Sequence, residues 1–179
     1  MKNKSRIVKM VLCALFTALI IVGAFLQINI IPSLPITLQY AFTTLAGLVL
    51  GYGWGTASVG LYILMGLIGI PVFTKGGGIG YFAVPSFGFI IGFLFNTFLT
   101  GWIAYHKQEN PSVPRLILAV FAGLVAGYII GILYMNMLLP DTSLGALIVT
   151  NIPFALKDAV LGIIFALASK KLVPFINRI

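Results

Sequence analysis

The chain has 179 residues, of which 60% are hydrophobic and only 8% are charged, and its formal net charge is +8. Soluble domains are roughly 45–50% apolar and about 25% charged, so this composition excludes an ordinary soluble domain. The apolar runs are continuous rather than alternating, which excludes a β-barrel and predicts membrane-spanning helices. The positive charges flank these runs, a pattern that indicates membrane topology rather than binding to nucleic acid.

Six apolar runs follow one another along the chain, and each is taken as a span because a span needs roughly 20 apolar residues. We therefore predict an all-α integral membrane protein, a single domain of six transmembrane helices at approximately 8–28, 36–51, 53–72, 84–105, 114–138 and 148–169. The second run is short and polar at its start, between Pro35 and Gln39.

The positions of lysine and arginine orient these six spans. Six crossings put both ends of the chain, the turn at 52–53 and the loop at 106–113 on one side. That side carries nine of the eleven cations, namely Lys2, Lys4, Arg6, Lys9, Lys107, Arg115, Lys170, Lys171 and Arg178. The other side has Lys75, and Lys157 falls inside the last run. Because cytoplasmic segments are enriched in lysine and arginine, we expect both termini to be cytoplasmic.

The sequence offers no constellation suited to catalysis. The P-loop pattern G-x-x-x-x-G-K-[ST] is absent, so ATP hydrolysis by that route is not expected. The single histidine, His106, stands beside Lys107 at a predicted helix end, and the acids Glu109, Asp141 and Asp158 are scattered. We therefore expect neither an enzyme nor a metal or cofactor site.

Three polar or glycine-rich segments, 29–39, 74–86 and 151–158, all fall at the extracytoplasmic end under this topology. Ionisable residues within a span are costly and usually face the bundle interior or a cavity. Lys157 and Asp158 therefore indicate an outward-facing ligand pocket, the alternative being a snorkelling lysine next to a structural aspartate.

The glycine-rich segment offers a second charge and a means of movement. Lys75 is interpreted either as a solvated loop cation or as a group that attracts an anionic ligand. The three glycines after it, Gly76 to Gly78, would give a lid the backbone freedom to move. The glycine-rich segment and the other two polar segments supply the candidate ligand-binding residues. These are Asp158, Lys157, Asn151, Gln39, Lys75, Tyr81, Phe82, Ser86 and Phe87.

Small residues recur every four positions in two of the runs, at Ala14 and Ala18 and at Gly123, Gly127 and Gly131. Such stripes let helices approach closely. Packing within the bundle and docking on a partner membrane protein are both consistent with this spacing.

Five strings, in their order and spacing, resemble the BioY family, the biotin-specific substrate-binding subunit (S component) of energy-coupling factor (ECF) vitamin transporters. The strings are ALFTALIIVGAF (Ala14 to Phe25), LPITLQ (Leu34 to Gln39), AGLVLG (Ala46 to Gly51), LIGIPVF (Leu67 to Phe73) and VPSFGFIIGF (Val84 to Phe93). The resemblance implies a six-helix subunit in the cell membrane of a prokaryote that captures its vitamin from outside.

The resemblance also implies partners, namely a transmembrane coupling protein and a pair of ATPases. Ala14 and Ala18 look like the alanine motif by which these subunits dock on the coupling protein. The segment from Thr74 to Ser86 matches the loop that acts as a lid in the family.

The chain departs from the family pattern at two positions. The family's aspartate in the last helix aligns with Asp158, but the lysine expected three residues later is Leu161 here, and Lys157 is the nearest replacement. Phe87 stands where the family has a glycine.

The resemblance makes biotin the expected ligand, and the chemistry of biotin suits the candidate residues. Asp158, Asn151 and Gln39 would meet its ureido group, while Lys75 and Lys157 would meet its carboxylate. Two alternatives stay open: the same scaffold binding a related acid such as lipoate, and a non-transporting membrane assembly protein.

Overall fold

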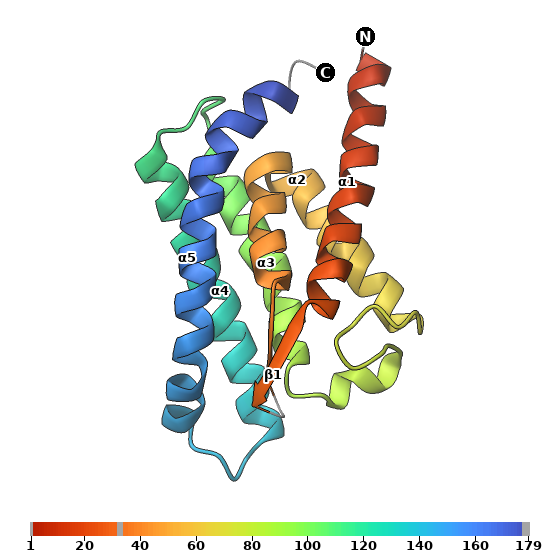
Figure 1. Ribbon diagram of the computed structural model, residues 1–179, viewed down its shortest axis with the longest axis vertical. Coiled ribbons are helices and arrows are strands. Elements are labelled where there is room, and N and C mark those ends of the chain that lie inside the picture. Colours follow the sequence, from red (N-terminus) through yellow and green to blue (C-terminus); the bar gives the residue numbers. More distant parts are fainter. Residues whose placement is uncertain (1, 32–33, 177–179) are drawn as a thin grey trace.

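The computed structural model describes residues 2–31 and 34–176, and within these ranges the chain forms five long helices, two short strands and one 3-10 helix (Figure 1). In chain order the elements are α1 (Lys2–Phe25), β1 (Gln27–Ile31), β2 (Leu34–Thr37), α2 (Gln39–Leu67), η1 (Ile79–Ala83), α3 (Phe87–Tyr105), α4 (Val113–Leu138) and α5 (Leu144–Ile176).

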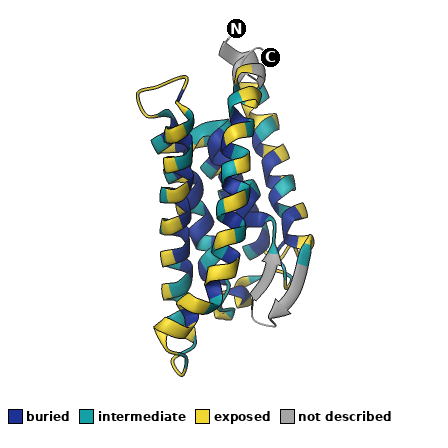
Figure 2. Cartoon of the chain, turned by 60° about the vertical axis from the view of Figure 1, so that its left-hand side comes forward, coloured by how far each residue is buried: buried dark blue, intermediate teal, exposed yellow. Residues whose placement is uncertain are grey.

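All five helices are long and apolar enough to cross a membrane. Figure 2 shows exposed residues along the outward faces of the helices, and many of these are large and apolar, such as Val125 and Ile129 on α4 and Ile152 and Leu156 on α5. A surface of this kind is suited to lipid tails rather than to water. The predicted class, an all-helical protein with several membrane-length apolar helices, is confirmed at this level.

Helix α2 is broken at Gly51, whose backbone has φ 72° and ψ −178°. Glycine alone adopts this conformation readily. A Cβ atom added at Gly55 would lie 2.8 Å from the carbonyl oxygen of Ala46, whereas nine residues of straight helix would separate the two by roughly 13 Å. The chain therefore reverses at Gly51, and the two arms of α2 pack against each other (Figure 1).

The bounds of these elements differ in places from the predicted spans. α1 ends at Phe25 rather than at 28, and α2 covers most of the two predicted spans 36–51 and 53–72 but ends at Leu67. Residues 68–72 belong instead to an irregular connection, in which Gly69 has φ 104°.

The segment between α1 and α2 forms an antiparallel hairpin that the all-α prediction did not include. Its register pairs Gln27 with Thr37, Ile28 with Ile36 and Ile31 with Leu34. Pro32 and Pro35 lie in this stretch of the sequence. Because proline lacks a backbone N–H and disfavours helix at the preceding residue, the stretch cannot continue α1.

The centre of the bundle is held by close helix contacts and by buried polar groups. A Cβ atom at Gly92 of α3 would come within 2.5 Å of the Gly127 carbonyl oxygen of α4, so the two backbones touch there. Asn96 of α3, fully buried, donates through its amide nitrogen to the hydroxyls of Thr43 (3.1 Å) and Thr44 (2.9 Å) of α2. The glycine stripe of the fifth predicted span thus serves packing within the bundle.

The connections gather at two ends of the bundle. In Figure 1 the beginning of α1, the connection between α3 and α4, and the end of α5 lie at one end. The β1–β2 hairpin and the connection between α4 and α5 lie toward the other end, and the segment between α2 and α3 lies beside the hairpin end. Of the polar segments singled out in the sequence, 29–39 and 74–86 therefore belong to the second end, and 151–158 begins about two turns into α5 from that end.

Candidate ligand-binding site

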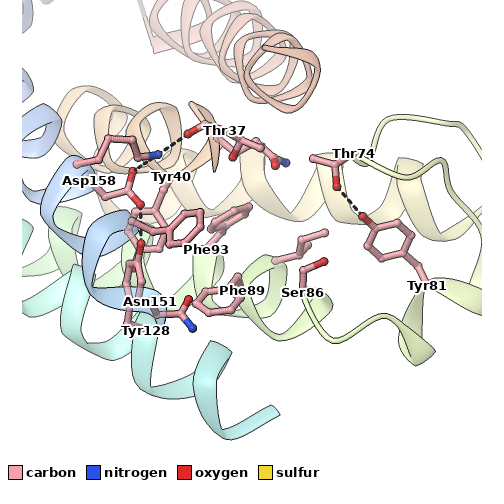
Figure 3. Close-up of a pocket in the computed structure, with 14 residues that line it drawn as sticks. Thr37, Tyr40, Thr74, Tyr81, Ser86, Phe89, Phe93, Tyr128, Asn151 and Asp158 are labelled. Atoms are coloured by element: carbon pink, nitrogen blue, oxygen red, sulfur yellow. Dashed lines mark hydrogen bonds and ion pairs between the residues drawn. The ribbon is translucent and has the colours of Figure 1, made fainter. Parts of the chain in front are cut away.

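A pocket lies among the end of β2, helices α2 to α5 and the segment between α2 and α3 (Figure 3). The pocket is open on one side, and the space in it and at its mouth that protein atoms do not fill is about 550 Å³. Asp158 and Tyr128 stand at one side of this space, and Thr74 and Tyr81 at the other. The lining residues are Thr37, Gln39, Tyr40, Thr74, Tyr81, Ser86, Phe89, Ile90, Phe93, Tyr128, Asn151, Phe154, Lys157 and Asp158.

One side of the pocket is built around a buried carboxylate. The side chain of Asp158 is only 4% exposed, and its Oδ1 lies 2.8 Å from Nζ of Lys157, whose side chain is 26% exposed. The Tyr128 hydroxyl of α4 donates to Oδ2 of Asp158 over 2.8 Å. Lys157 also donates to the backbone carbonyl of Thr37 at the end of β2. Three elements thus meet at one ion pair, which lowers the cost of placing these charges inside a span.

Aromatic rings form the wall beside this carboxylate. The ring of Tyr40 packs at 5.5 Å from Phe93 and at 5.2 Å from Tyr128, and Phe89 lies 5.5 Å from Tyr128. The Tyr40 hydroxyl donates to the backbone carbonyl of Leu124 over 3.0 Å, so its polar end is satisfied by α4. Apolar walls with a few placed polar groups are the usual make-up of a small-molecule pocket.

Further polar groups come from α2, from the earlier part of α5 and from the segment between α2 and α3. Gln39, the first residue of α2, donates through its side-chain nitrogen to the Tyr62 hydroxyl at 2.5 Å. The amide nitrogen of Asn151 donates to the carbonyl of Leu147 over 2.8 Å. The buried hydroxyl of Ser86 has no hydrogen-bond partner among the described residues. A buried polar atom without a partner, lining a pocket, is suited to bonding with a ligand.

Six of the nine predicted site residues line this one pocket: Asp158, Lys157, Asn151, Gln39, Tyr81 and Ser86. Lys75, Phe82 and Phe87 do not line it. Lys75 is exposed in the segment between α2 and α3, and Phe82 is 47% exposed. Phe87 is buried in an aromatic cluster with Phe73, at 6.3 Å, so its bulk fills the core instead of the pocket.

The glycine-rich segment is firmly packed on the end of α2. Phe73 is 1% exposed, and its ring occupies the space where Gly66 would carry a Cβ atom, 2.0 Å from that position. The N–H of Gly78 donates to the carbonyl of Gly66 over 2.7 Å. Gly76 and Gly78 have φ of 110° and 97°, values that favour glycine. The glycines expected to give a lid its freedom therefore also shape this packed turn.

Sequence reasoning missed several lining residues, above all Tyr128 and Tyr40. Both are tyrosines inside apolar spans, and a buried tyrosine hydroxyl usually needs a partner. This need for a hydrogen-bond partner was the available signal that the two tyrosines line a polar site. It does not show which helix face each tyrosine occupies, because that depends on how α2 and α4 are rotated against α3.

These features describe a helical membrane protein with a partly buried, charged and aromatic pocket near one end. A family model described as the BioY family matches residues 1–178. The chain belongs to the BioY family, which confirms the resemblance carried by the five strings.

Two relatives resemble this chain over most of its length. A protein named probable biotin transporter BioY from Lysinibacillus sphaericus is 39% identical over 75% of this chain and 68% of its own length. The biotin transporter BioY of Thermotoga maritima is 33% identical over 92% of this chain and 95% of its own. These are transport proteins, and this membership agrees with the prediction that the chain is not an enzyme.

A solved structure resembles the fold closely. The crystal structure of the S-component for biotin from an ECF-type ABC transporter superposes with a TM-score of 0.83 at 29% identity, covering 96% of this chain and 94% of that chain.

Proposed function

We propose that this chain is the S component of an ECF transporter, that it binds biotin in the pocket around Asp158, and that it delivers biotin inward together with a coupling protein and a pair of ATPases. The observation that carries the proposal is the buried Asp158 carboxylate, held by Tyr128 and Lys157 in a pocket with aromatic walls. The fold shared with the S-component for biotin supports the same reading.

The chemistry of biotin suits the polar groups and the aromatic wall of the pocket. Its ureido group has two N–H donors and a carbonyl acceptor, which suit the Asp158 carboxylate and the amide of Asn151. Oδ1 of Asp158 has no hydrogen-bond partner among the described residues besides its ion pair with Lys157, so it retains capacity to accept. The apolar bicycle and chain of biotin suit Tyr40, Phe89 and Phe93.

The ion pair bears on the lysine that the family pattern expects and that this chain replaces by Leu161. Leu161 does not line the pocket, but Lys157 does, and its ammonium contacts Asp158. This contact supports Lys157 as the replacement. Lipoate has no ureido group, so it would leave the Asp158 carboxylate without N–H donors, which favours biotin over lipoate.

We further propose that both ends of the chain are cytoplasmic and that the two arms of α2 cross the membrane separately, giving six spans. Lys107, Arg115 and Lys170 lie near the end of the bundle where α1 begins, consistent with the positive-inside rule. The arm 39–50 spans only about 18 Å of a core about 30 Å thick. The hairpin extends that crossing, since irregular backbone is tolerated at membrane depth where protein covers it.

Ala14 and Ala18 are proposed to dock on the coupling protein. Both are exposed on the outward face of α1, together with Val11, Leu15 and Val22. Small residues there let a partner helix approach the α1 backbone closely.

The decisive experiment is equilibrium binding to the purified full chain with biotin, desthiobiotin and lipoate. Biotin and desthiobiotin, which share the ureido group, are expected to bind and lipoate to bind far more weakly. Failure to bind biotin at micromolar concentration contradicts the proposal. Failure of all three, with no uptake when coupling protein and ATPases are co-expressed, favours the membrane assembly alternative.

A further inference from the structure

The ammonium group of Lys157 connects two parts of the molecule that lie far apart in the sequence. It donates to the backbone carbonyl of Thr37, 120 positions away, and lies 2.8 Å from Oδ1 of Asp158 (Figure 3). Thr37 is the last residue of β2 and Lys157 lies in the middle of α5. A lysine that merely snorkelled toward water would not be held by two acceptors inside a pocket.

We infer that Lys157 is a positioning residue that couples the β1–β2 hairpin to the Asp158 carboxylate. One ammonium group, with its three donors, would hold the end of the hairpin at the edge of the pocket and fix the carboxylate. The position of the hairpin and the orientation of Asp158 toward a ligand then depend on the same ammonium group. The part that concerns the ligand rests on the proposed function, whereas the part that concerns the hairpin does not.

The other contacts around Thr37 make this contact decisive for the hairpin. The residue that follows, Leu38, donates its N–H to the Gly23 carbonyl of α1 over 3.1 Å, so α1 holds one side of the hairpin's exit. Lys157 holds the other side from α5. Without it, the hydrogen bonds that tie this exit to the rest of the bundle, among the described residues, come from α1 and from the start of α2.

Asp158 gains its orientation from the same arrangement. Tyr128 occupies Oδ2 and Lys157 faces Oδ1, so the carboxylate is fixed from two helices. Removing the ammonium leaves a carboxylate that is 4% exposed, with the Tyr128 hydroxyl as its hydrogen-bond partner among the described residues. A buried charge deprived of its counter-ion is strongly unfavourable, so the carboxylate would reorient or take up a proton.

The test is amide hydrogen exchange of the hairpin, measured by mass spectrometry on the purified full chain without ligand. Lys157→Met keeps a long unbranched side chain but removes the charge, and we expect the peptide covering 27–38 to exchange at least threefold faster. Lys171→Met is the matched control, because Lys171 is exposed near the end of the same helix. Its hairpin should exchange as in the unsubstituted chain. Equal hairpin exchange in Lys157→Met and Lys171→Met overturns the inference.

Two further variants separate the contact from a general loss of stability. Asp158→Asn keeps Lys157 and its bond to Thr37, so hairpin exchange should stay within about twofold of the unsubstituted chain. The double variant Lys157→Met with Asp158→Asn leaves no unpaired buried charge, so it folds even where Lys157→Met alone does not. Its hairpin should still exchange at least threefold faster. Slow exchange in the double variant overturns the coupling.

Biotin affinity, measured on the same proteins, tests the second half. Lys157→Met should weaken biotin binding at least tenfold, and Lys157→Arg, which keeps a cation, should recover part of the loss. A hairpin loosened by Lys157→Met in a chain that does not bind biotin at all contradicts the proposed function but supports the coupling. Normal affinity in Lys157→Met overturns the link to Asp158.

Discussion

The hydroxyl of Tyr128 donates a hydrogen bond of 2.8 Å to Oδ2 of Asp158, which ties α4 to α5 at the wall of the pocket. Both residues are buried, at 8% and 5% exposure. Hydrogen bonds to charged groups contribute roughly 1.5–3 kcal/mol, more than those between neutral groups. The pair therefore sets the geometry that a ligand meets.

Tyr128→Phe is expected to weaken biotin binding by about tenfold or more. The ring would keep its packing against Tyr40 and Phe89, so the loss isolates the hydroxyl, and about 1.4 kcal/mol corresponds to tenfold in affinity. Isothermal titration calorimetry measures the change. Tyr105→Phe removes a hydroxyl that bonds the Leu48 carbonyl away from the pocket and should leave affinity unaltered. Equal affinities of the two variants would remove Tyr128 from the site.

Asp158→Asn is expected to weaken biotin binding about 100-fold or more. Asparagine has the same shape but lacks the charge that pairs with Lys157 and accepts N–H groups. Lys107→Ala, in the connection between α3 and α4 at the other end of the bundle, serves as the control and should bind normally. If both variants bind biotin alike, Asp158 is not a ligand-binding residue.

Gly66→Ala is expected to lower both thermal stability and biotin affinity. The added methyl would lie 2.0 Å from the ring of Phe73, which packs at 4.5 Å on the pocket residue Tyr81. Overpacking of this kind typically costs about 1–3 kcal/mol. Thermal unfolding in detergent and a binding titration measure the two effects.

Gly60→Ala is the matched control for that substitution, since it makes the same change in the same helix. A Cβ atom at Gly60 meets nothing within 4 Å. Alanine is also the better helix former, so stability should hold or rise. A Gly60→Ala loss as large as that of Gly66→Ala would contradict the role given to Phe73.

Asn96→Ala is expected to lower the thermal midpoint while leaving biotin affinity within about twofold. The substitution removes two hydrogen bonds between α2 and α3, each contributing about 0.6 kcal/mol on average inside membranes. Asn96 does not line the pocket. Asn110→Ala, an exposed residue that bonds Lys170 at the opposite end, should change neither quantity. A loss of affinity without a loss of stability would contradict this division.

The apolar runs predicted the helices well, because length and hydropathy alone decide whether a segment crosses lipid. They did not predict the β1–β2 hairpin. The stretch 29–39 was recognised as polar, and Pro32 and Pro35 argue against a continuous helix, but neither feature predicts that the segment pairs with itself as two strands. The reversal within α2 was foreseen as a turn at 52–53, one residue from Gly51, since glycine marks such a position without fixing the backbone angles.

The polar pocket was partly predictable for a similar reason. Charged and amide side chains within a span, such as Lys157 and Asn151, are rare enough to point to a cavity. Aromatic residues are too common in such spans to point to a cavity. Phe87 was placed in the pocket and lies in the core, while Tyr128 was passed over and contacts Asp158. Helix rotation decides between these outcomes, and a stretch that is apolar all round does not encode its rotation in a visible pattern.

The sharp turn at Gly51 packs against a second glycine, Gly101, which lies far along the chain. Gly51 has φ 72°, and a Cβ atom at Gly101 of α3 would lie 2.4 Å from the backbone nitrogen of Tyr52. A side chain is strained at Gly51 by the backbone conformation and has no room at Gly101, although neither residue lines the pocket. In a screen for variants that fail to take up biotin, substitutions at these two glycines should score as strongly as substitutions in the pocket, yet they would report on assembly of the bundle. Measuring how much folded protein reaches the membrane separates the two kinds of loss.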